Sequence, residues 1–356
     1  MTEIAVNLSR NLKPVPEDDK LGFGIHFTDH MLVMDYNLDQ GWHNMQIAPY
    51  GSIEVDPSMM VLHYGQAVFE GMKAFRASNG NINIFRARDH FQRFNNSAAR
   101  VCIPEFDIEA LLDGLKKLLE IDNRWVPSTH GTALYIRPFI FATDQFLGVR
   151  PSHTYKLMII LSPVGAYYAE GFNPVKIMVE DRYVRAVRGG IGAIKTPGNY
   201  AASLLAAVEA KEKGFTQVLW LDAIEQKWLE EVGTMNIMLK LDDEVITPPL
   251  NGSILPGITR DSTIKLLQQW QVPISEKQIS IDEVMEAGHN GRLKEMFGTG
   301  TAAVISPVGS IHYKDESVVI NDGRVGELSQ RLFDEITAIQ YGDKEDVNNW
   351  IETVRV

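Results

Sequence analysis

Lys195 stands in a glycine-punctuated stretch, GGIGAIKTPGNY at residues 189–200, that leads into an apolar segment. It is the one charged residue between positions 189 and 208. An amine held against tightly turning backbone, followed by the phenol of Tyr200, suits a lysine that forms a Schiff base and its hydrogen-bonding partner. The alternative is an ordinary solvated lysine, because lysines in loops are usually exposed.

Two further stretches have the composition of anion sites. Pro256-Gly257 precedes a helical pattern, so free backbone N–H groups and the helix dipole at its start favour a phosphate. In residues 297–303 (FGTGTAA), two glycines allow close backbone approach and two threonines offer hydroxyls, so this turn can line a phosphate or carboxylate. A plain helix start and a plain β-turn are the alternatives. Neither stretch is a dinucleotide fingerprint or a P-loop.

Glu230 and Glu231 are adjacent carboxylates in a strand-like segment. Neighbouring residues of a strand point to opposite faces, so one carboxylate can be solvated while the other faces inward. A buried carboxylate needs a cationic partner, and a protonated pyridine nitrogen would serve. Two surface glutamates are the alternative.

Two arginines are candidates for anion recognition. Arg93 lies on a predicted helix between Phe91 and Phe94, where it can clamp a phosphate or cap a carboxylate. Tyr135 and Arg137 share one face of an apolar strand, which could place an arginine fork at the distal carboxylate of a dicarboxylate. A structural ion pair is the alternative for Arg137. The histidines lack the paired spacing of metal ligands, so no metal site is predicted.

The elements that must position these groups follow an α/β pattern. Gly198 or Asn199 can start the helix that carries Tyr200, and Gly214 can end it. Other helices are predicted at 64–71, 89–102, 108–119, 260–270, 281–287 and 326–341. Strands are predicted at 28–36, 45–55, 72–77, 82–85, 133–142, 155–161, 175–179, 217–221, 227–231, 235–241, 244–247, 293–297 and 302–305. The predicted domains are residues 1–165 and 177–356, with a linker at 166–176.

The composition excludes several classes of protein. The 356 residues are 45% hydrophobic and 22% charged, as in soluble globular proteins. A formal net charge of -12 argues against binding nucleic acid or an anionic membrane, and no apolar run has the length of a membrane span. Cys102 is the single cysteine, so an internal disulfide is excluded. Without a signal-peptide pattern at the start, a cytoplasmic location is expected.

Three stretches together carry a family resemblance: FTDHML at 27–32, FEGMKAF at 69–75 and EVGTMN at 231–236. From about Phe23 to the end, the chain resembles the branched-chain amino-acid aminotransferases, which are fold-type IV pyridoxal-phosphate enzymes. It is most similar to the subgroup that includes the animal enzymes. The resemblance implies an α/β (α+β) fold with a smaller N-terminal α/β domain and a larger C-terminal pseudo-barrel domain that binds the cofactor.

The resemblance also implies roles for the candidate residues. Lys195 would be the catalytic residue and form the internal aldimine with pyridoxal 5′-phosphate. Tyr200 would hydrogen-bond the phenolic oxygen of the cofactor, and Glu231 would keep its pyridine nitrogen protonated. The cofactor-binding residues would be Arg93, Lys195, Tyr200, Glu231, Thr234, Ile258, Thr259 and Thr301, of which Arg93, Ile258, Thr259 and Thr301 hold the phosphate. The substrate-binding residues would be Phe23, Tyr64, Phe69, Tyr135, Arg137, Tyr167, Thr234, Thr301 and Ala302.

The implied reaction is reversible transamination of L-leucine, L-isoleucine and L-valine with 2-oxoglutarate, giving branched-chain 2-oxo acids and L-glutamate by ping-pong kinetics. A homodimer is implied, in which a partner loop closes the site and places Tyr64, Leu147 and Val149 at the interface. Animal members carry a Cys-x-x-Cys pair where this chain has Ala303 and Ser306, so thiol-based redox control is not expected.

Two other functions stay open from the residues. One keeps the fold and cofactor but changes the reaction, as in D-amino-acid aminotransferases and aminodeoxychorismate lyases. The Tyr135-x-Arg137 strand and the Glu-Gly-Met-Lys stretch favour the branched-chain enzymes over these. The other is a phosphate-binding or sugar-phosphate-binding protein without lysine chemistry, which leaves the coincidence of Lys195, Tyr200 and Glu231 unexplained.

Overall fold

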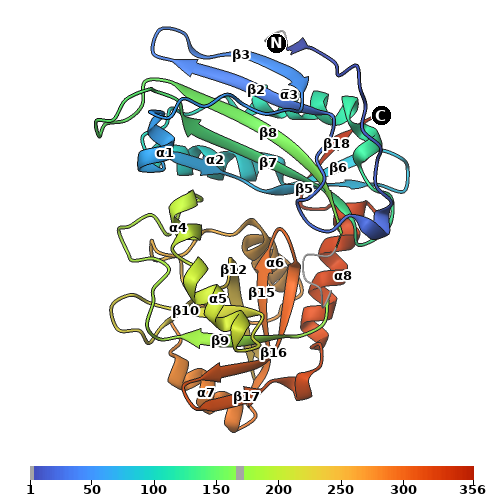
Figure 1. The fold of residues 1–356 in the computed structure, drawn as a ribbon. Helices are drawn as coiled ribbons and strands as arrows, with labels where there is room; N and C mark the ends of the chain where they lie inside the picture. The colour runs from blue at the N-terminus through green and yellow to red at the C-terminus, as the bar shows by residue number, and fades with distance from the viewer. Residues whose placement is uncertain (1–3, 166–171) are drawn as a thin grey trace. The chain divides into compact units, whose positions relative to one another are not determined.

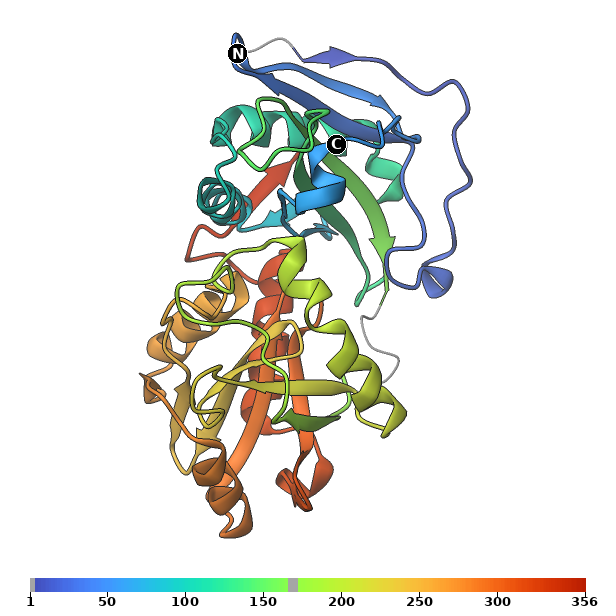
Figure 2. The ribbon, with the colours of Figure 1, turned by 60° about the vertical axis from the view of Figure 1, so that its left-hand side comes forward.

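The computed structural model of the protein describes residues 4–165 and 172–356 (Figures 1 and 2). The chain divides into two compact units. The first consists of Met1–Tyr167, Lys195–Pro197 and Ala338–Val356, and the second of Tyr168–Ile194 and Gly198–Thr337. Each unit is described by itself. Most of the predicted linker, residues 166–171, lies outside the described residues, so the predicted domain boundaries stay a prediction.

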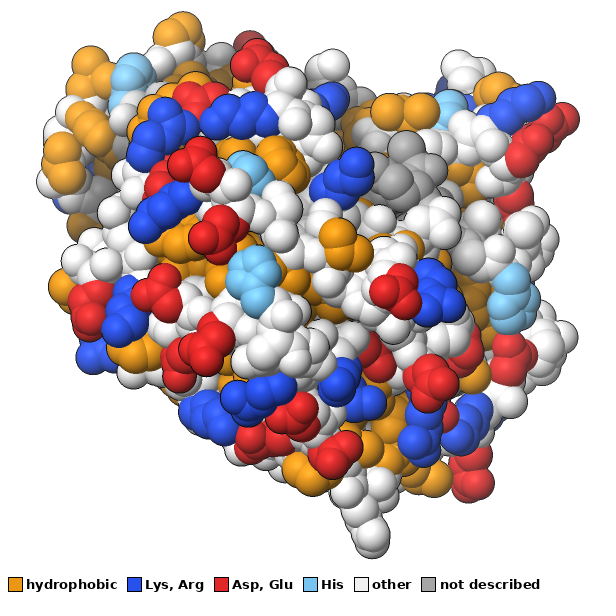
Figure 3. Space-filling model, turned by 90° about the horizontal axis from the view of Figure 1, so that it is seen from below, with side chains coloured by type: hydrophobic (Ala, Val, Ile, Leu, Met, Phe, Trp, Pro, Cys, Tyr) orange, Lys and Arg blue, Asp and Glu red, His pale blue; other side chains and the backbone are white. Residues whose placement is uncertain are grey.

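The surface fits the composition of the chain. On the face that Figure 3 shows, acidic and basic side chains are interspersed. Within the described residues, no helix has both the length and the apolar character that crossing a membrane would require.

The first unit is built on a nine-stranded sheet with the order β1-β3-β2-β8-β7-β5-β6-β18, and β4 also pairs with β7. All of these pairs are antiparallel except β1 with β3. The strands are β1 Ala5–Val6, β2 His30–Asn37, β3 Gly41–Pro49, β4 Ala67–Phe69, β5 Met72–Arg76, β6 Ile82–Phe85, β7 Ala133–Ala142, β8 Tyr155–Val164 and β18 Ile351–Val354. The helices between them are η1 Asp18–Lys20, α1 Met60–Tyr64, α2 Ala87–Arg100, α3 Ile108–Ile121 and η2 Asn123–Trp125.

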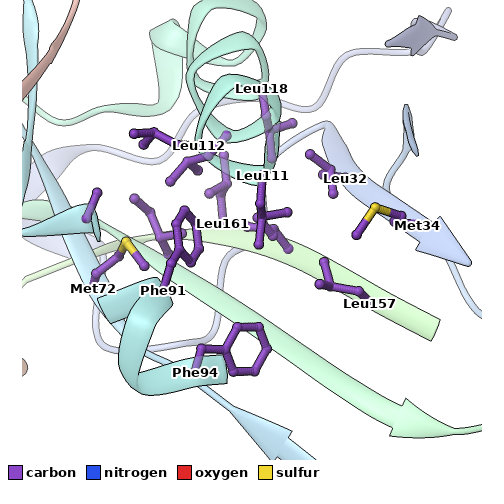
Figure 4. Packing of buried hydrophobic residues seen from close by; sticks show 14 of the residues in the cluster. Leu32, Met34, Met72, Phe91, Phe94, Leu111, Leu112, Leu118, Leu157 and Leu161 are labelled. Carbon is purple, nitrogen blue, oxygen red and sulfur yellow. The ribbon is translucent and has the colours of Figure 1, made fainter. Parts of the chain in front are cut away.

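One face of this sheet packs against α2 and α3 (Figure 4). Phe91 and Phe94 of α2 and Leu111 of α3 are fully buried there, together with alternate residues of β7 such as Ile136. Each such side chain contributes about 1.5–3 kcal/mol by leaving water. Because successive strand residues point to opposite faces, the other residues of β7 lie on the far face, and Tyr135 and Arg137 are among them.

The second unit contains a closed circuit of six strands, β11-β10-β9-β16-β15-β12, in which β12 pairs back with β11. Three further strands extend it: β13 and β14 beyond β12, and β17 beside β16. The strands are β9 Val175–Glu180, β10 Gln217–Leu221, β11 Leu229–Val232, β12 Met235–Leu241, β13 Glu244–Thr247, β14 Ile274–Glu276, β15 Leu293–Gly300, β16 Val304–Tyr313 and β17 Glu316–Val319. The helices of this half of the chain are α4 Pro197–Ala201, α5 Leu204–Glu212, α6 Ile258–Gln269, α7 Ile281–His289, η3 Asn321–Gly323 and α8 Glu327–Tyr341. The closed circuit confirms the predicted barrel-like sheet within an α/β fold.

Most of the predicted elements are confirmed. β7, β10, β12 and β13 have the predicted bounds, and the predicted helices from α2 to α8 agree with the structure to within about two residues, apart from the α4–α5 segment. The β5–β6 hairpin turns where Asn79-Gly80 predicts it, with Gly80 at a φ of 86°. Strong periodicity and turn chemistry are local signals, which explains why they succeed.

Several predicted elements differ from the structure, and the strand predicted at 302–305 is β16 at Val304–Tyr313. The helix predicted at 64–71 is instead the end of α1, which Gly65 terminates at a φ of 61°, followed by β4. The strand predicted at 45–55 is β3, which ends at Pro49. The single helix predicted from Tyr200 is two, α4 and α5, and Leu204, Leu205 and Val208 of α5 are exposed.

A further correction concerns the glycines of residues 297–303. Gly298 and Gly300 belong to β15, and the turn is confined to residues 301–303. A Cβ on Gly298 would lie 2.7 Å from the Met235 side chain. Gly298 is therefore needed for close packing of strands β12 and β15, not for a turn around an anion.

Candidate active site

The candidate residues fall on both units, and each group is described within its own unit. In the first unit, the backbone around Lys195 is held by β4 and α2. The Lys195 N–H donates to Ser97 Oγ at 3.0 Å, and its carbonyl accepts from the Phe69 N–H at 3.0 Å. Thr196 Oγ1 donates to the Ala67 carbonyl at 2.8 Å. These bonds fix where the lysine side chain begins.

The Lys195 amine lies in a partly buried, aromatic and cationic environment. Nζ is 5.0 Å from the centre of the Phe69 ring. Burial, which removes water from the ammonium, and the charges of Arg93 and Arg137 together lower the pKa of Lys195 to about 8, against the opposing charge of Glu70. The alternative of an ordinary solvated lysine is therefore wrong. An amine with this pKa is a usable nucleophile and base near neutral pH.

Arg93 lies on the α2 face that also carries Ser97 and His90. It pairs side-on with Glu70, with Nε 2.6 Å from Oε1 and Nη2 2.9 Å from Oε2. His90 Nδ1 is 2.9 Å from the same Oε2. Burial would raise the pKa of Glu70, but Arg93 and His90 outweigh it and hold the pKa far below its usual range. Burial lowers the pKa of His90. Of the predicted alternatives, the carboxylate cap is confirmed, and the phosphate clamp stays a prediction.

Tyr135 and Arg137 share a face of β7 as predicted. Arg137 Nη2 donates to the Tyr135 hydroxyl at 3.0 Å, and the guanidinium lies 4.8 Å from the Phe69 ring centre. Phe23 packs edge-on against Tyr135, with 5.2 Å between the centres of the two rings. Within the described residues Arg137 Nε is buried with no hydrogen-bond partner, and no ion pair of Arg137 occurs there, so the structural ion pair lacks support. The result is an aromatic wall that carries one guanidinium.

Lys73 was not predicted as a site residue. It lies on β5 directly opposite Tyr135, so the two side chains share one face of the sheet. Its exposed fraction is only 8%, and burial lowers its pKa to about 8. The buried Ser162 flanks Tyr135 on the other side, from β8. Only the strand register brings these residues together, and no spacing in the sequence signals it.

In the second unit, Tyr200, Glu231 and Thr234 line one small cavity, and their roles stay predictions. Glu231 is buried, and its Oε1 accepts the Leu255 N–H at 2.8 Å while its Oε2 lies 3.3 Å from Arg185 Nε. The full lining is Arg185, Gly192, Ile194, Asn199, Tyr200, Ser203, Glu231, Gly233, Thr234 and Leu255. Arg185 and Leu255 were not predicted, because they meet Glu231 through tertiary folding.

Glu230 is buried as well, so neither glutamate faces solvent and the alternative of two surface glutamates is wrong. Burial raises the pKa of Glu230. Ser253 Oγ contacts both Glu230 Oε1 and Asn251 Oδ1. A hydroxyl has one proton to donate, so Ser253 can donate to only one of these two oxygens at a time. The strand face away from the cavity is therefore a second buried site, not a solvated surface.

The predicted anion-binding residues lie at the start of a helix and in a turn. Ile258 and Thr259 form the first turn of α6, whose N-cap, Gly257, makes no side-chain capping bond. A Cβ on Gly257 would lie 2.0 Å from Asn236 Oδ1, so glycine is required there. Thr301 and Ala302 lie in the turn between β15 and β16. Their roles in binding phosphate and carboxylate stay predictions.

The residues predicted for the dimer interface are exposed within the first unit. Tyr64, Leu147 and Val149 have exposed fractions of 42%, 61% and 85%. Backbone bonds between the segments around Met60 and Asp144 hold them on one patch, where the Tyr64 hydroxyl contacts the Leu147 carbonyl. Tyr167 lies outside the described residues.

Comparison with known proteins identifies the class. The family described as amino-transferase class IV matches residues 67–311, more than half of the chain. The chain belongs to this family and is an aminotransferase, as the resemblance predicted.

Its relatives narrow the class. "Branched-chain-amino-acid aminotransferase 2" of Bacillus subtilis (strain 168) is 55% identical over 351 residues, which cover 99% of this chain and 97% of the relative. The crystal structure of the Escherichia coli branched-chain amino acid aminotransferase matches with a TM-score of 0.78 and 29% identity, covering 92% of this chain and 99% of that one. Another solved branched-chain amino acid aminotransferase, in complex with pyridoxamine 5′-phosphate, matches with a TM-score of 0.75 and 25% identity, over 94% and 99% of the two chains. The chain therefore groups with the branched-chain aminotransferases, and the predicted resemblance is confirmed.

Proposed function

We propose that this protein transfers the amino group of L-leucine, L-isoleucine and L-valine to 2-oxoglutarate, reversibly and by ping-pong kinetics, with pyridoxal 5′-phosphate attached to Lys195. The observation that carries this proposal is the Lys195 amine, whose pKa is lowered to about 8 beside Arg93 and an aromatic wall. The similarity to branched-chain aminotransferases supports the choice of substrates.

The residues of the chain fit the chemistry of the cofactor. A phosphate ester binds a guanidinium and N–H donors. In this proposal Arg93 supplies the guanidinium, and the N–H donors come from Ile258, Thr259 and the turn at Thr301. A protonated ring nitrogen asks for a buried carboxylate, and Glu231 is buried and held by two partners, Arg185 and the Leu255 N–H. When bound, pyridoxal 5′-phosphate supplies an electron sink for the substrate α-carbon.

Each protein group has a defined task in this proposal. Lys195 Nζ takes the proton from the substrate Cα and returns it in the reverse direction as general base and acid. Glu231, a buried carboxylate, would keep the ring nitrogen of the bound cofactor protonated. Tyr200 donates a hydrogen bond to the phenolic oxygen. Thr234 and the turn at Thr301-Ala302 bind the substrate α-carboxylate.

The two substrates differ in side-chain polarity, and one wall must accept both. Phe23, Phe69 and Tyr135 offer apolar area to a branched side chain, and Tyr64 would extend this wall. Arg137 offers its guanidinium to the distal carboxylate of 2-oxoglutarate, and its Nε has no protein partner among the described residues. Because the Arg137 guanidinium has no ion-pair partner among the described residues, it can bind an anionic substrate that enters and leaves the site.

The proposed assembly is a homodimer in which the partner subunit closes the site. The exposure of Tyr64, Leu147 and Val149 on one patch supports it. The cytoplasmic location expected from the sequence stays a prediction.

An absorbance titration tests the function. We expect purified protein to show the cofactor band near the visible region, to lose it with L-leucine and to regain it with 2-oxoglutarate. Lys195→Ala is expected to abolish both conversions because it removes the attachment point and the base. Bleaching by D-alanine but not L-leucine would assign the D-amino-acid reaction instead. A protein that stays colourless after incubation with pyridoxal 5′-phosphate would contradict the proposal altogether.

A further inference from the structure

Glu70 forms a buried polar centre that the proposed function does not use. Its side chain is fully buried, on the residue that follows β4, and its N–H donates to the Pro138 carbonyl at 2.8 Å. Its carboxylate meets two groups of α2, Arg93 at 2.6 and 2.9 Å and His90 at 2.9 Å, and it accepts the Gly71 N–H at 2.9 Å. The carboxylate is thus fixed from the backbone as well as from α2.

The pairing fixes the orientation of Arg93, not only its position. Glu70 accepts hydrogen bonds from Nε and Nη2 of Arg93. A guanidinium is planar and has five N–H donors in a rigid arrangement. Once one edge is fixed on a carboxylate, the direction of Nη1 is fixed as well. Buried ion pairs contribute little net stability compared with well-packed apolar residues, so stability alone is a weak reason for this arrangement.

The pair also acts on Lys195. The charge of Arg93 lowers the pKa of Lys195, and the charge of Glu70 raises it. A guanidinium beside Lys195 without its carboxylate would suppress protonation of the amine more strongly than the pair does. The pKa of Lys195, which burial lowers first, is therefore also sensitive to the pairing of Arg93 with Glu70.

We propose that Glu70, supported by His90, is a positioning residue: it orients the Arg93 guanidinium toward the phosphate of the cofactor. This inference rests on the proposed role of Arg93 as phosphate clamp. The Glu70 carboxylate orients the Arg93 guanidinium at the phosphate site and takes part in no chemical step.

The test compares two ligands of the full-length, cofactor-free protein: pyridoxal 5′-phosphate and pyridoxal, which lacks the phosphate. The dissociation constants of both are measured by absorbance for wild type, Glu70→Gln, Arg93→Gln and the double variant. The matched control is Asp122→Asn, which alters another buried carboxylate, paired with His30 at 2.6 Å. We expect Glu70→Gln to raise the dissociation constant of pyridoxal 5′-phosphate about tenfold to a hundredfold more than that of pyridoxal. Hydrogen bonds to charged groups have free energies of this size. The double variant should lose no more than Arg93→Gln alone.

The second readout is the pKa of the Lys195 amine, measured by the pH dependence of its chemical acylation and mapped by mass spectrometry. Glu70→Gln should move this pKa further below about 8. Glu70→Asp keeps the charge but shortens the arm, so it should lower the preference for the phosphate while leaving the pKa near the wild-type value. This variant carries the test if Glu70→Gln does not fold.

The outcomes separate the two levels of the proposal. If Arg93→Gln leaves the preference for pyridoxal 5′-phosphate over pyridoxal unchanged, both the phosphate role and this inference fail. If Arg93→Gln removes the preference but neither Glu70 variant does, only the positioning role fails. If Glu70→Gln weakens the binding of both ligands equally, Glu70 is a structural residue and the inference is wrong. A general loss of structure would have this effect, and Asp122→Asn would then show it too.

Discussion

Lys195 and Lys73 are both lysines whose ammonium groups the fold removes from water, and in both burial lowers the pKa to about 8. At pH 7 a lysine with this pKa is neutral about 300 times more often than one with the ordinary value of about 10.5. The sequence signals the first through its glycine-rich loop. It does not signal the second, since Lys73 becomes buried only through the pairing of β5 with β7.

We therefore predict that both lysines react with an acylating reagent with an apparent pKa near 8. The measurement is peptide mapping by mass spectrometry across pH, with exposed lysines such as Lys211 as the internal control. Because the folded state binds fewer protons than the unfolded state, stability should rise with pH between about 8 and 10.5. Titration of Lys195 at the ordinary lysine value would contradict the described environment.

Glu230 provides a second pH-dependent signal, of opposite sign. Its pKa is raised in the folded protein because the carboxyl is buried. The folded state therefore holds the proton more tightly than the unfolded state. This contribution to stability is fully present below the ordinary glutamate pKa of about 4.5 and is lost as pH rises through the raised pKa.

We predict that Glu230→Gln becomes progressively more stabilising, relative to wild type, as pH rises from about 5 to about 8. Denaturant unfolding at several pH values measures the difference in unfolding free energy. The control is Glu225→Gln, an exposed glutamate of the turn before β11. A pH-independent difference between Glu230→Gln and wild type would show that Glu230 is ionised throughout.

At the scale of elements, α8 shows how a helix end depends on a distant strand. Glu295 of β15 accepts the N–H groups of Leu328 and Ser329 at 2.9 Å each and the Ser329 hydroxyl at 2.8 Å. A Cβ on Gly326 would lie 2.0 Å from this carboxylate, so the glycine makes room for it. The carboxylate thus caps the helix N-terminus and complements its dipole.

We predict that Glu295→Ala lowers the free energy of unfolding by about 1–2 kcal/mol, the usual cost of losing an N-cap with its dipole interaction. Chemical denaturation measures it. Glu283→Ala is the matched comparison, because Glu283 belongs to a local capping box with Ser280 on α7. An unchanged unfolding free energy for Glu295→Ala would mean that water replaces the carboxylate without cost.

At the scale of the whole molecule, several large apolar side chains are exposed to water in the monomer. Leu147 and Val149 are exposed on the patch that also holds Tyr64. We predict that the double variant Leu147→Asp, Val149→Asp shifts a dimer toward monomer and lowers transaminase activity, because charges at an interface core are costly to bury.

Sedimentation across a concentration series measures this shift. The control is Val319→Asp, an equally apolar residue with an exposed fraction of 64% on β17, which should leave the association state unchanged. A wild-type protein that sediments as a monomer at all concentrations would contradict the proposed dimer.

Local signals allow the sequence by itself to determine much of this protein. The lysine loop, the periodic helices, the β5–β6 hairpin and the family resemblance all depend on residues near one another in the chain, where turn chemistry and hydrophobic period act directly. The sequence also places Tyr135 and Arg137 on one strand face, because alternation is a property of the strand alone.

The tertiary structure decided which groups surround those residues. Arg185 and the Leu255 N–H reach Glu231, and Glu70 reaches Arg93, across 46, 24 and 23 positions of the chain. Glu230, which the strand pattern allowed to face solvent, is buried because Ser253 and Asn251 lie against its strand face. Burial and charge pairing are properties of the packed chain, so no local pattern carries them. The positions of the candidate residues were therefore predictable, and their partners and pKa shifts were not.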